Sequence, residues 1–115
     1  HDLRVRMPRD RRVLPIADAL TAEPGDRRSL DDWAESLEFS SKTLARIFQN
    51  ETGISFHSWR QLVRVQSALE QLSNGASVAL VARSLGYAQT STFIDAFRRV
   101  LNVTPGQYRA HALAA

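Results

Sequence analysis

One pattern of residues occurs twice in this chain of 115 residues. Three pairs match at an offset of 48: Ala34 with Ala82, Leu37 with Leu85, and Phe39 with Tyr87. Three more match at an offset of 49: Leu44 with Phe93, Phe48 with Phe97, and Ile54 with Val103. In each copy the apolar residues recur with the period of a helix on both sides of a short break. The duplication therefore predicts two units of helix, tight turn and helix in one chain.

The residues around each break fit the close packing of two short helices. Ala34 in the first copy and Ala82 in the second are small enough to face a partner helix closely. The turn of the second copy contains Gly86, whereas the first copy has Glu38 at the corresponding place. A left-handed backbone costs a non-glycine residue about 1 kcal/mol, which the fold can carry. We therefore expect Glu38 to take that conformation.

Apolar spacing and capping residues predict helices along the rest of the chain, and no alternation of period two indicates a strand. The expected helices cover residues 10–22, beginning near Val13 or bending at Pro15; 29–37, capped by Ser29; 41–51, capped by Ser40 or Ser41; 56–73; 77–85; 89 or 90 to 100; and a last short one from Pro105, capped by Thr104. The predicted fold class is all-α, with seven helices forming two homeodomain-like helix-turn-helix lobes joined by a long linker helix.

The chain divides at the polar breaks between these helices. We expect an arm or the end of an interdomain linker over residues 1–9, a first lobe over 10–55, a linker helix over 56–74 and a second lobe over 75–115. The linker helix would be a rod of about 26 Å, at about 1.5 Å per residue. Together with the side lobes, it would separate the two second helices by roughly 34 Å, which is one turn of a DNA duplex.

The charge of the chain is compatible with DNA binding but does not identify it. The formal net charge is only +3. Fourteen of the 15 basic residues are arginines, which favour bidentate contacts to phosphate or guanine. A GC-rich genome explains the same bias equally well for most of the surface arginines. The distribution of charge over the helices therefore matters more than its sum.

The outward face of each second helix carries side chains suited to DNA. In the first copy these are Ser41, Lys42, Ala45, Arg46 and Gln49. In the second copy they are Gln89, Thr90, Ser91, Thr92, Asp95, Arg98 and Arg99. Hydroxyl, amide and guanidinium groups bond base edges and phosphates, and helix N-termini suit phosphate oxygens. We therefore predict sequence-specific binding of double-stranded DNA by the helices near 41–51 and 90–100; the alternative is a helical protein–protein interaction module.

Other kinds of site have no residue pattern behind them. The chain has no cysteine, and its three histidines lie far apart without helical pairing, so we expect no metal site. No nucleophile elbow or phosphate-binding glycine loop is present, so we expect neither an enzyme nor a cofactor. No apolar run approaches the roughly 18 residues of a membrane span. Trp33 and Trp59 have the helical spacing of core residues.

The two copies resemble the AraC/XylS family of transcriptional regulators over about residues 10–110. In the first copy the resemblance rests on residues 43–48 (TLARIF) and 51–55 (ETGIS). In the second it rests on residues 81–87 (VARSLGY), 93–99 (FIDAFRR) and 104–109 (TPGQYR). The resemblance implies a two-lobed DNA-binding domain whose recognition helices enter adjacent segments of the major groove on one face of the duplex.

By this resemblance, Lys42, Ala45 and Arg46 occupy base-facing positions of the first recognition helix, and Thr90, Ser91 and Asp95 those of the second. Arg46 is long enough to donate two hydrogen bonds to guanine. Asp95 departs from the family pattern, because many relatives have arginine or a small residue there. A carboxylate repels phosphates but can accept from cytosine N4. We expect the first lobe to be the main source of base specificity.

The resemblance also predicts what surrounds this domain. Family members usually carry an effector-sensing or dimerisation domain before it, so we expect a fragment of a longer, cytoplasmic protein; a short stand-alone member is the alternative. RNA polymerase is a second candidate partner beside promoter or operator DNA. The operator sequence, the effector and the choice between activation and repression are left open by these residues.

Overall fold

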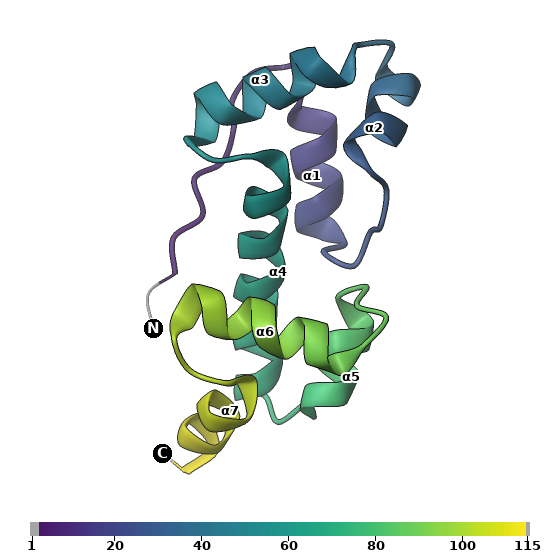
Figure 1. Ribbon diagram of the computed structural model, residues 1–115. Helices are drawn as coiled ribbons and strands as arrows, with labels where there is room; N and C mark the ends of the chain where they lie inside the picture. Colours follow the sequence, from purple (N-terminus) through teal and green to yellow (C-terminus); the bar gives the residue numbers. More distant parts are fainter. Residues whose placement is uncertain (1–2, 115) are drawn as a thin grey trace.

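The computed structural model describes residues 3–114, in which seven α-helices and no strand are present. The helices are α1 (Leu14–Ala22), α2 (Leu30–Leu37), α3 (Ser41–Thr52), α4 (Phe56–Ser73), α5 (Val78–Ser84), α6 (Thr90–Leu101) and α7 (Pro105–Ala114). They are stacked as two lobes on the central helix α4, with α1 to α3 around one end and α5 to α7 around the other (Figure 1). The all-α prediction with seven helices is confirmed.

Each lobe has a core of its own, and α4 contributes to both. Near its start, Phe56, Trp59 and Val63 pack with the buried residues of α1, α2 and α3. Further along, the helix contributes Val65, Ala68 and Leu72 to the core of the second lobe. The apolar stripes of α3 and α6 also face these cores: Leu44, Ile47 and Phe48 in the first, Phe93 and Phe97 in the second. Burial on one face of α3 and of α6 leaves the opposite face to solvent.

Serine and threonine caps set the beginnings of most helices where the sequence predicts them. Ser29 and Asp32 form a reciprocal capping box at α2. Ser40, rather than Ser41, accepts the backbone N–H of Thr43 at the start of α3. In α1, Pro15 lies in the first turn, where a missing N–H costs little, so the helix begins at Leu14 and does not bend.

The two turns between paired helices use the left-handed backbone that the repeat predicts. Glu38 has a φ of 62° after α2, and Gly86 has a φ of 83° after α5. The expectation for Glu38 is therefore confirmed. Because both turns adopt this conformation, α3 follows α2 in much the same way as α6 follows α5, and the two second helices run in the same direction across α4 (Figure 1).

The segment before α1 lies extended along α4 (Figure 1). The indole N–H of Trp59 donates to the carbonyl of Arg6 at 3.1 Å, and the amide of Gln66 donates to the carbonyl of Leu3 at 3.3 Å. Gln66 is exposed on α4 and holds this segment through that hydrogen bond. Leu3 packs against the second core and Val5 against the first. Residues 1–2 of the predicted arm lie outside the described residues.

The two lobes also touch through backbone, beside α4. A Cβ atom on Gly25, in the loop after α1, would lie 2.3 Å from the carbonyl oxygen of Ser84 at the end of α5. A Cβ on Gly86 would lie 2.7 Å from the carbonyl oxygen of Gly25. Arg64 of α4 fixes the same loop, donating to the carbonyls of Pro24 and Asp26 at 3.0 Å each. This contact sets how the α5–α6 turn sits against the first lobe.

Candidate nucleic-acid interface

The outward face of α3 has three side chains free for a partner. Lys42, Ala45 and Arg46 are exposed. Lys42 and Arg46 are four residues apart, which places them one above the other on the same face. Among residues 3–114, no salt bridge or hydrogen bond occupies either cationic group. The middle of this face therefore offers two uncompensated positive charges beside a small apolar side chain.

The other two predicted residues of α3 are already engaged within the domain. Ser41 is half-buried, and its hydroxyl donates a short hydrogen bond to the Asp31 carboxylate of α2. Gln49 donates its amide N–H to the carbonyl of Gly53 at 2.9 Å, folding back over the end of α3. Each keeps acceptor capacity, because a hydroxyl and an amide oxygen both accept hydrogen bonds. Their contact with DNA stays a prediction.

The outward face of α6 is mixed in charge. Gln89 precedes the helix and makes no capping hydrogen bond, so its amide is free. Ser91, Thr92, Asp95, Arg98 and Arg99 are exposed, whereas Thr90 is half-buried. In residues 3–114 no salt bridge joins Asp95 to a neighbouring arginine. Asp95, Arg98, Arg99 and Asn102 line a shallow hollow of about 360 Å³.

The two predicted faces therefore differ in electrostatics. The face of α3 presents Lys42 and Arg46 without an acid, whereas α6 presents Asp95 between a polar N-terminal turn and two arginines. Arg98 and Arg99 lie in the last turn of α6, where cations also interact favourably with the helix dipole. The charges on the exposed face of α3 therefore only attract a polyanion, whereas those on α6 both attract and repel it.

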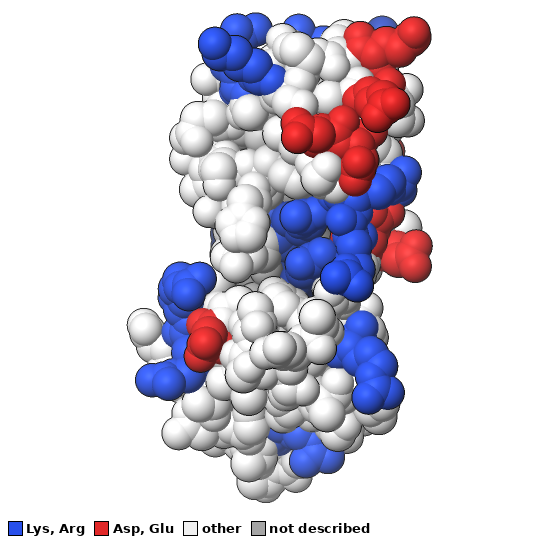
Figure 2. Space-filling model, turned by 45° about the vertical axis from the view of Figure 1, so that its right-hand side comes forward, with Lys and Arg blue, Asp and Glu red and all other residues white. Residues whose placement is uncertain are grey.

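The structure adds a basic site that the sequence patterns did not predict. A hollow of about 480 Å³ opens at the waist between the lobes, and we call it the waist hollow; it is lined by His57, Arg60, Gln61, Arg64, Gly86, Tyr87, Ala88, Gln89 and Thr92. Basic side chains gather at this waist, and acidic side chains cover part of the upper lobe beside it (Figure 2). A sequence signal did exist, because Arg60 and Arg64 lie one turn apart on the predicted linker helix. Arg27 also reaches this region, since its Cγ lies near Gly86.

Local hydrogen bonds shift the pKa of two carboxyl groups near the N-terminal lobe. The Arg12 guanidinium, by hydrogen bonding, lowers the pKa of Asp10 to about 2. A hydrogen bond from Arg28 lowers the pKa of Asp26, which lies at the waist. Asp26 is thus ionised and paired with Arg28 at 2.6 Å. The nearby charge of Arg60 lowers the pKa of Asp26 further, although the ion pair itself is with Arg28.

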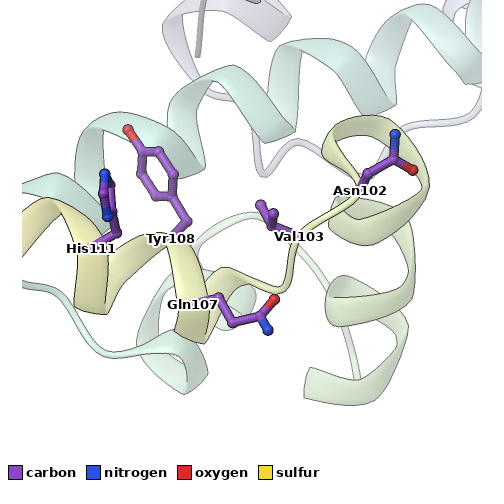
Figure 3. A pocket seen from close by; sticks show the side chains of 5 residues that line it. All are labelled: Asn102, Val103, Gln107, Tyr108 and His111. Carbon is purple, nitrogen blue, oxygen red and sulfur yellow. The ribbon is translucent and has the colours of Figure 1, made fainter.

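A second hollow, of about 610 Å³, lies between the end of α6 and α7. Figure 3 shows Tyr108 and His111 of α7 projecting on the same side of that helix, with Gln107 on the other side. The hydroxyls of Tyr108 and Ser73 are 3.1 Å apart. None of the predicted DNA-facing residues lines this hollow.

Two further features of residues 3–114 bear on the possible sites. No group of three histidine, aspartate or glutamate side chains in this part of the chain is placed to hold a metal ion. No helix among the same residues is long and apolar enough to cross a membrane. Trp33 and Trp59 are buried, with 5% and 0% of their surface exposed, which confirms them as core residues.

This chain is similar to known proteins in both sequence and fold. A family model described as a helix-turn-helix domain matches residues 33–111. The chain is 37% identical over 102 residues to the HTH-type transcriptional regulator RipA of Corynebacterium glutamicum, a match that covers 89% of this chain and 31% of RipA. It is 35% identical over 100 residues to a putative AraC-like transcription regulator of Streptomyces lividans, covering 84% of this chain and 33% of that protein.

Among solved structures, the DNA-binding domain of AdpA, in complex with a target DNA, superposes with a TM-score of 0.82 at 25% identity. The match covers 89% of this chain and 93% of the AdpA chain. The chain spans about a third of the length of the two curated relatives. Both the sequence matches and the duplicated helical lobes agree, and the chain therefore belongs to the AraC-type helix-turn-helix family of transcriptional regulators.

Proposed function

We propose that this chain binds double-stranded DNA sequence-specifically, as the DNA-binding part of a bacterial transcriptional regulator. The observation that carries the proposal is the repeated geometry: α3 and α6 follow equivalent left-handed turns and run in the same direction on one rigid helix (Figure 1). The domain is 47 Å long, which exceeds the roughly 34 Å of one DNA turn. One molecule therefore has the reach to place both helices in adjacent segments of the major groove.

The first lobe is proposed as the main source of base specificity. Lys42 and Arg46 are unpaired and exposed on α3, and an arginine there can form two hydrogen bonds with guanine O6 and N7. Ala45 between them suits a thymine methyl group. In the second lobe, Ser91 of α6 and Gln89 just before it can donate and accept hydrogen bonds, but Asp95 opposes the phosphate charge. The second lobe would then add contacts with less discrimination, or select cytosine through Asp95.

The test is titration of three matched duplexes, built from a sequence that the domain enriches from a random pool. One duplex keeps both half-sites, one keeps only a single half-site, and the third has both half-sites scrambled. We expect the first to bind at least about a thousandfold more tightly than the third at physiological salt. Equal affinity for all three duplexes, at every salt concentration, would mean that the domain binds DNA only by charge attraction and without sequence specificity.

The alternative of a protein interaction module without DNA binding has less support. The large apolar side chains that remain exposed are Met7, Phe39, Leu80 and Leu113. They belong to four different segments of the described chain, namely the arm, the α2–α3 turn, α5 and α7. A docking face for a partner helix would instead show such residues in one contiguous patch.

The rest of the regulator is proposed from the length of the relatives. Because the chain covers about a third of them, a sensing or dimerisation domain is expected in the remainder. We propose RNA polymerase as a further partner, and the cytoplasm as the place of action because bacterial DNA lies there. In vitro transcription from a promoter that carries the selected site would show whether the bound domain activates or represses.

A further inference from the structure

Arg60 is held in a fixed position at the waist. Its guanidinium carbon lies 5.0 Å from the centre of the Phe56 ring, and its Nη1 donates to the carbonyl of Arg28 at 2.6 Å. Stacking and this hydrogen bond fix the guanidinium plane while leaving most of its five N–H donors unused. Arg60 is half-buried on one wall of the waist hollow. It is therefore a pre-positioned donor rather than a mobile surface cation.

The positive charge around Arg60 is only partly offset by an acid. The carboxylate that faces it, Asp26, is already in a bidentate pair with Arg28. Arg64, one turn further along α4, donates hydrogen bonds from its Nε and Nη2 to two backbone carbonyls. Burial and then the nearby charge of Arg64 lower the pKa of Arg60. In residues 3–114 neither arginine of α4 has a salt bridge to an acid, so an incoming anion would relieve their repulsion.

The opposite wall of the waist hollow is the start of the second recognition unit. It consists of Gly86, Tyr87, Ala88 and Gln89 before α6, and Thr92 in its first turn. Two of these, Gln89 and Thr92, also belong to the predicted DNA face. The hollow thus lies between α4 and the N-terminal end of α6, at the waist where basic side chains gather (Figure 2). A duplex bound by α3 and α6 would carry its sugar-phosphate backbone past this place, because two adjacent major-groove segments are separated by phosphates.

We propose that the waist hollow binds a phosphate of the DNA backbone between the two major-groove segments, with Arg60 as its main donor. Arg64 contributes by holding the loop of residues 24–26 and by adding positive charge. The hollow is lined by α4 and by the turn before α6, so a phosphate bound there would contact both the linker helix and the second lobe. This inference rests on the proposed DNA binding. The added contact would fix the position of the domain along the duplex and would not distinguish between bases.

The first experiment compares Arg60→Gln with Arg83→Gln, which removes the same charge from an exposed position in the last turn of α5 outside the hollow. Affinity for the selected duplex and for a random duplex is measured at several salt concentrations. For Arg60→Gln we expect about a tenfold loss on both duplexes, and a salt slope reduced by about 0.9. Arg83→Gln should keep the wild-type slope. Equal changes in both variants, or a lower melting temperature of Arg60→Gln with an unchanged slope, would overturn the proposal.

The second experiment uses the wild-type protein and so does not depend on how a variant folds. Each phosphate between the two half-sites is replaced in turn by an uncharged methylphosphonate. Wild-type affinity should fall about tenfold at one or two positions, and Arg60→Gln should show no further loss at those positions. Tight binding of the two-half-site duplex without any sensitive phosphate would refute the waist contact and leave the proposed function standing. No specific binding of any duplex would refute both.

Discussion

Replacing Gly25 by alanine tests whether the two lobes are locked by backbone contact. The new Cβ would lie 2.3 Å from the carbonyl oxygen of Ser84, 3.3 Å from its carbonyl carbon and 3.5 Å from the nitrogen of Gly86. Carbon and oxygen normally approach to about 3.3 Å at the closest. The loop and the α5–α6 turn must therefore separate by about 1 Å. Because the obstacle is backbone, no side-chain rotation can relieve it.

Overpacking of this kind costs about 1–3 kcal/mol. For a domain of this size, that corresponds to a melting temperature lower by about 4–12 °C in circular dichroism or calorimetry. Since the displaced turn leads into α6, affinity for a duplex with both half-sites should fall more than affinity for the first half-site alone.

Gly106→Ala is the matched control, because the nearest heavy atom to its new Cβ would be Thr104 Oγ1 at 3.9 Å. That residue lies in α7, where alanine is favoured over glycine by up to about 1 kcal/mol. We expect an unchanged or slightly higher melting temperature and unchanged DNA affinity. A Gly25→Ala domain with the stability and half-site preference of the wild type would refute the account of the lobe contact.

Three further changes test individual side chains. Arg46→Ala should cost about 1–3 kcal/mol on the selected duplex and relax preference at one base pair, as measured by repeating the titration with each base substituted; an equal loss on random duplex would assign Arg46 to phosphate instead. Asp95→Asn should raise affinity for random duplex and steepen its salt dependence, because a repulsive charge is removed. Lost discrimination at a cytosine would show that Asp95 recognises that base. A larger loss of specific affinity than for Arg46→Ala would contradict the proposal that the first lobe is the main source of base specificity. The Asp10 carboxyl should titrate near pH 2 by NMR, and Arg12→Gln should return its pKa toward 3.8. Since folding lowers this pKa, any stabilisation by the pair exists above pH 4 and is lost as the pH falls toward 2.

The helices and caps could be predicted because their causes are local. A serine before an apolar stripe caps a helix wherever the stripe is buried, as Ser29 and Ser77 do. The repeat also allowed one prediction from a residue far away in the sequence. Because Glu38 stands where the second copy has glycine, its left-handed backbone followed from comparison of the two copies.

What the sequence did not predict depends on contacts between segments far apart in the chain. The backbone contact beside the waist hollow joins the loop after α1 to the turn after α5, and no periodic pattern links residues 24–28 with residues 84–86. Gln66 donates to the carbonyl of Leu3, which belongs to an irregular segment without a periodic pattern. Likewise, the hydrogen bond that occupies Ser41 comes from Asp31 on the neighbouring helix. These features require the packed structure.

Selection from a pool of random duplexes shows whether one molecule of this domain recognises two segments of DNA on one face of the duplex. We expect one enriched site with two short blocks of preferred bases about ten base pairs apart, bound far more tightly than random duplex at physiological salt. Absence of any enriched sequence, with weak binding that vanishes at moderate salt, would contradict it.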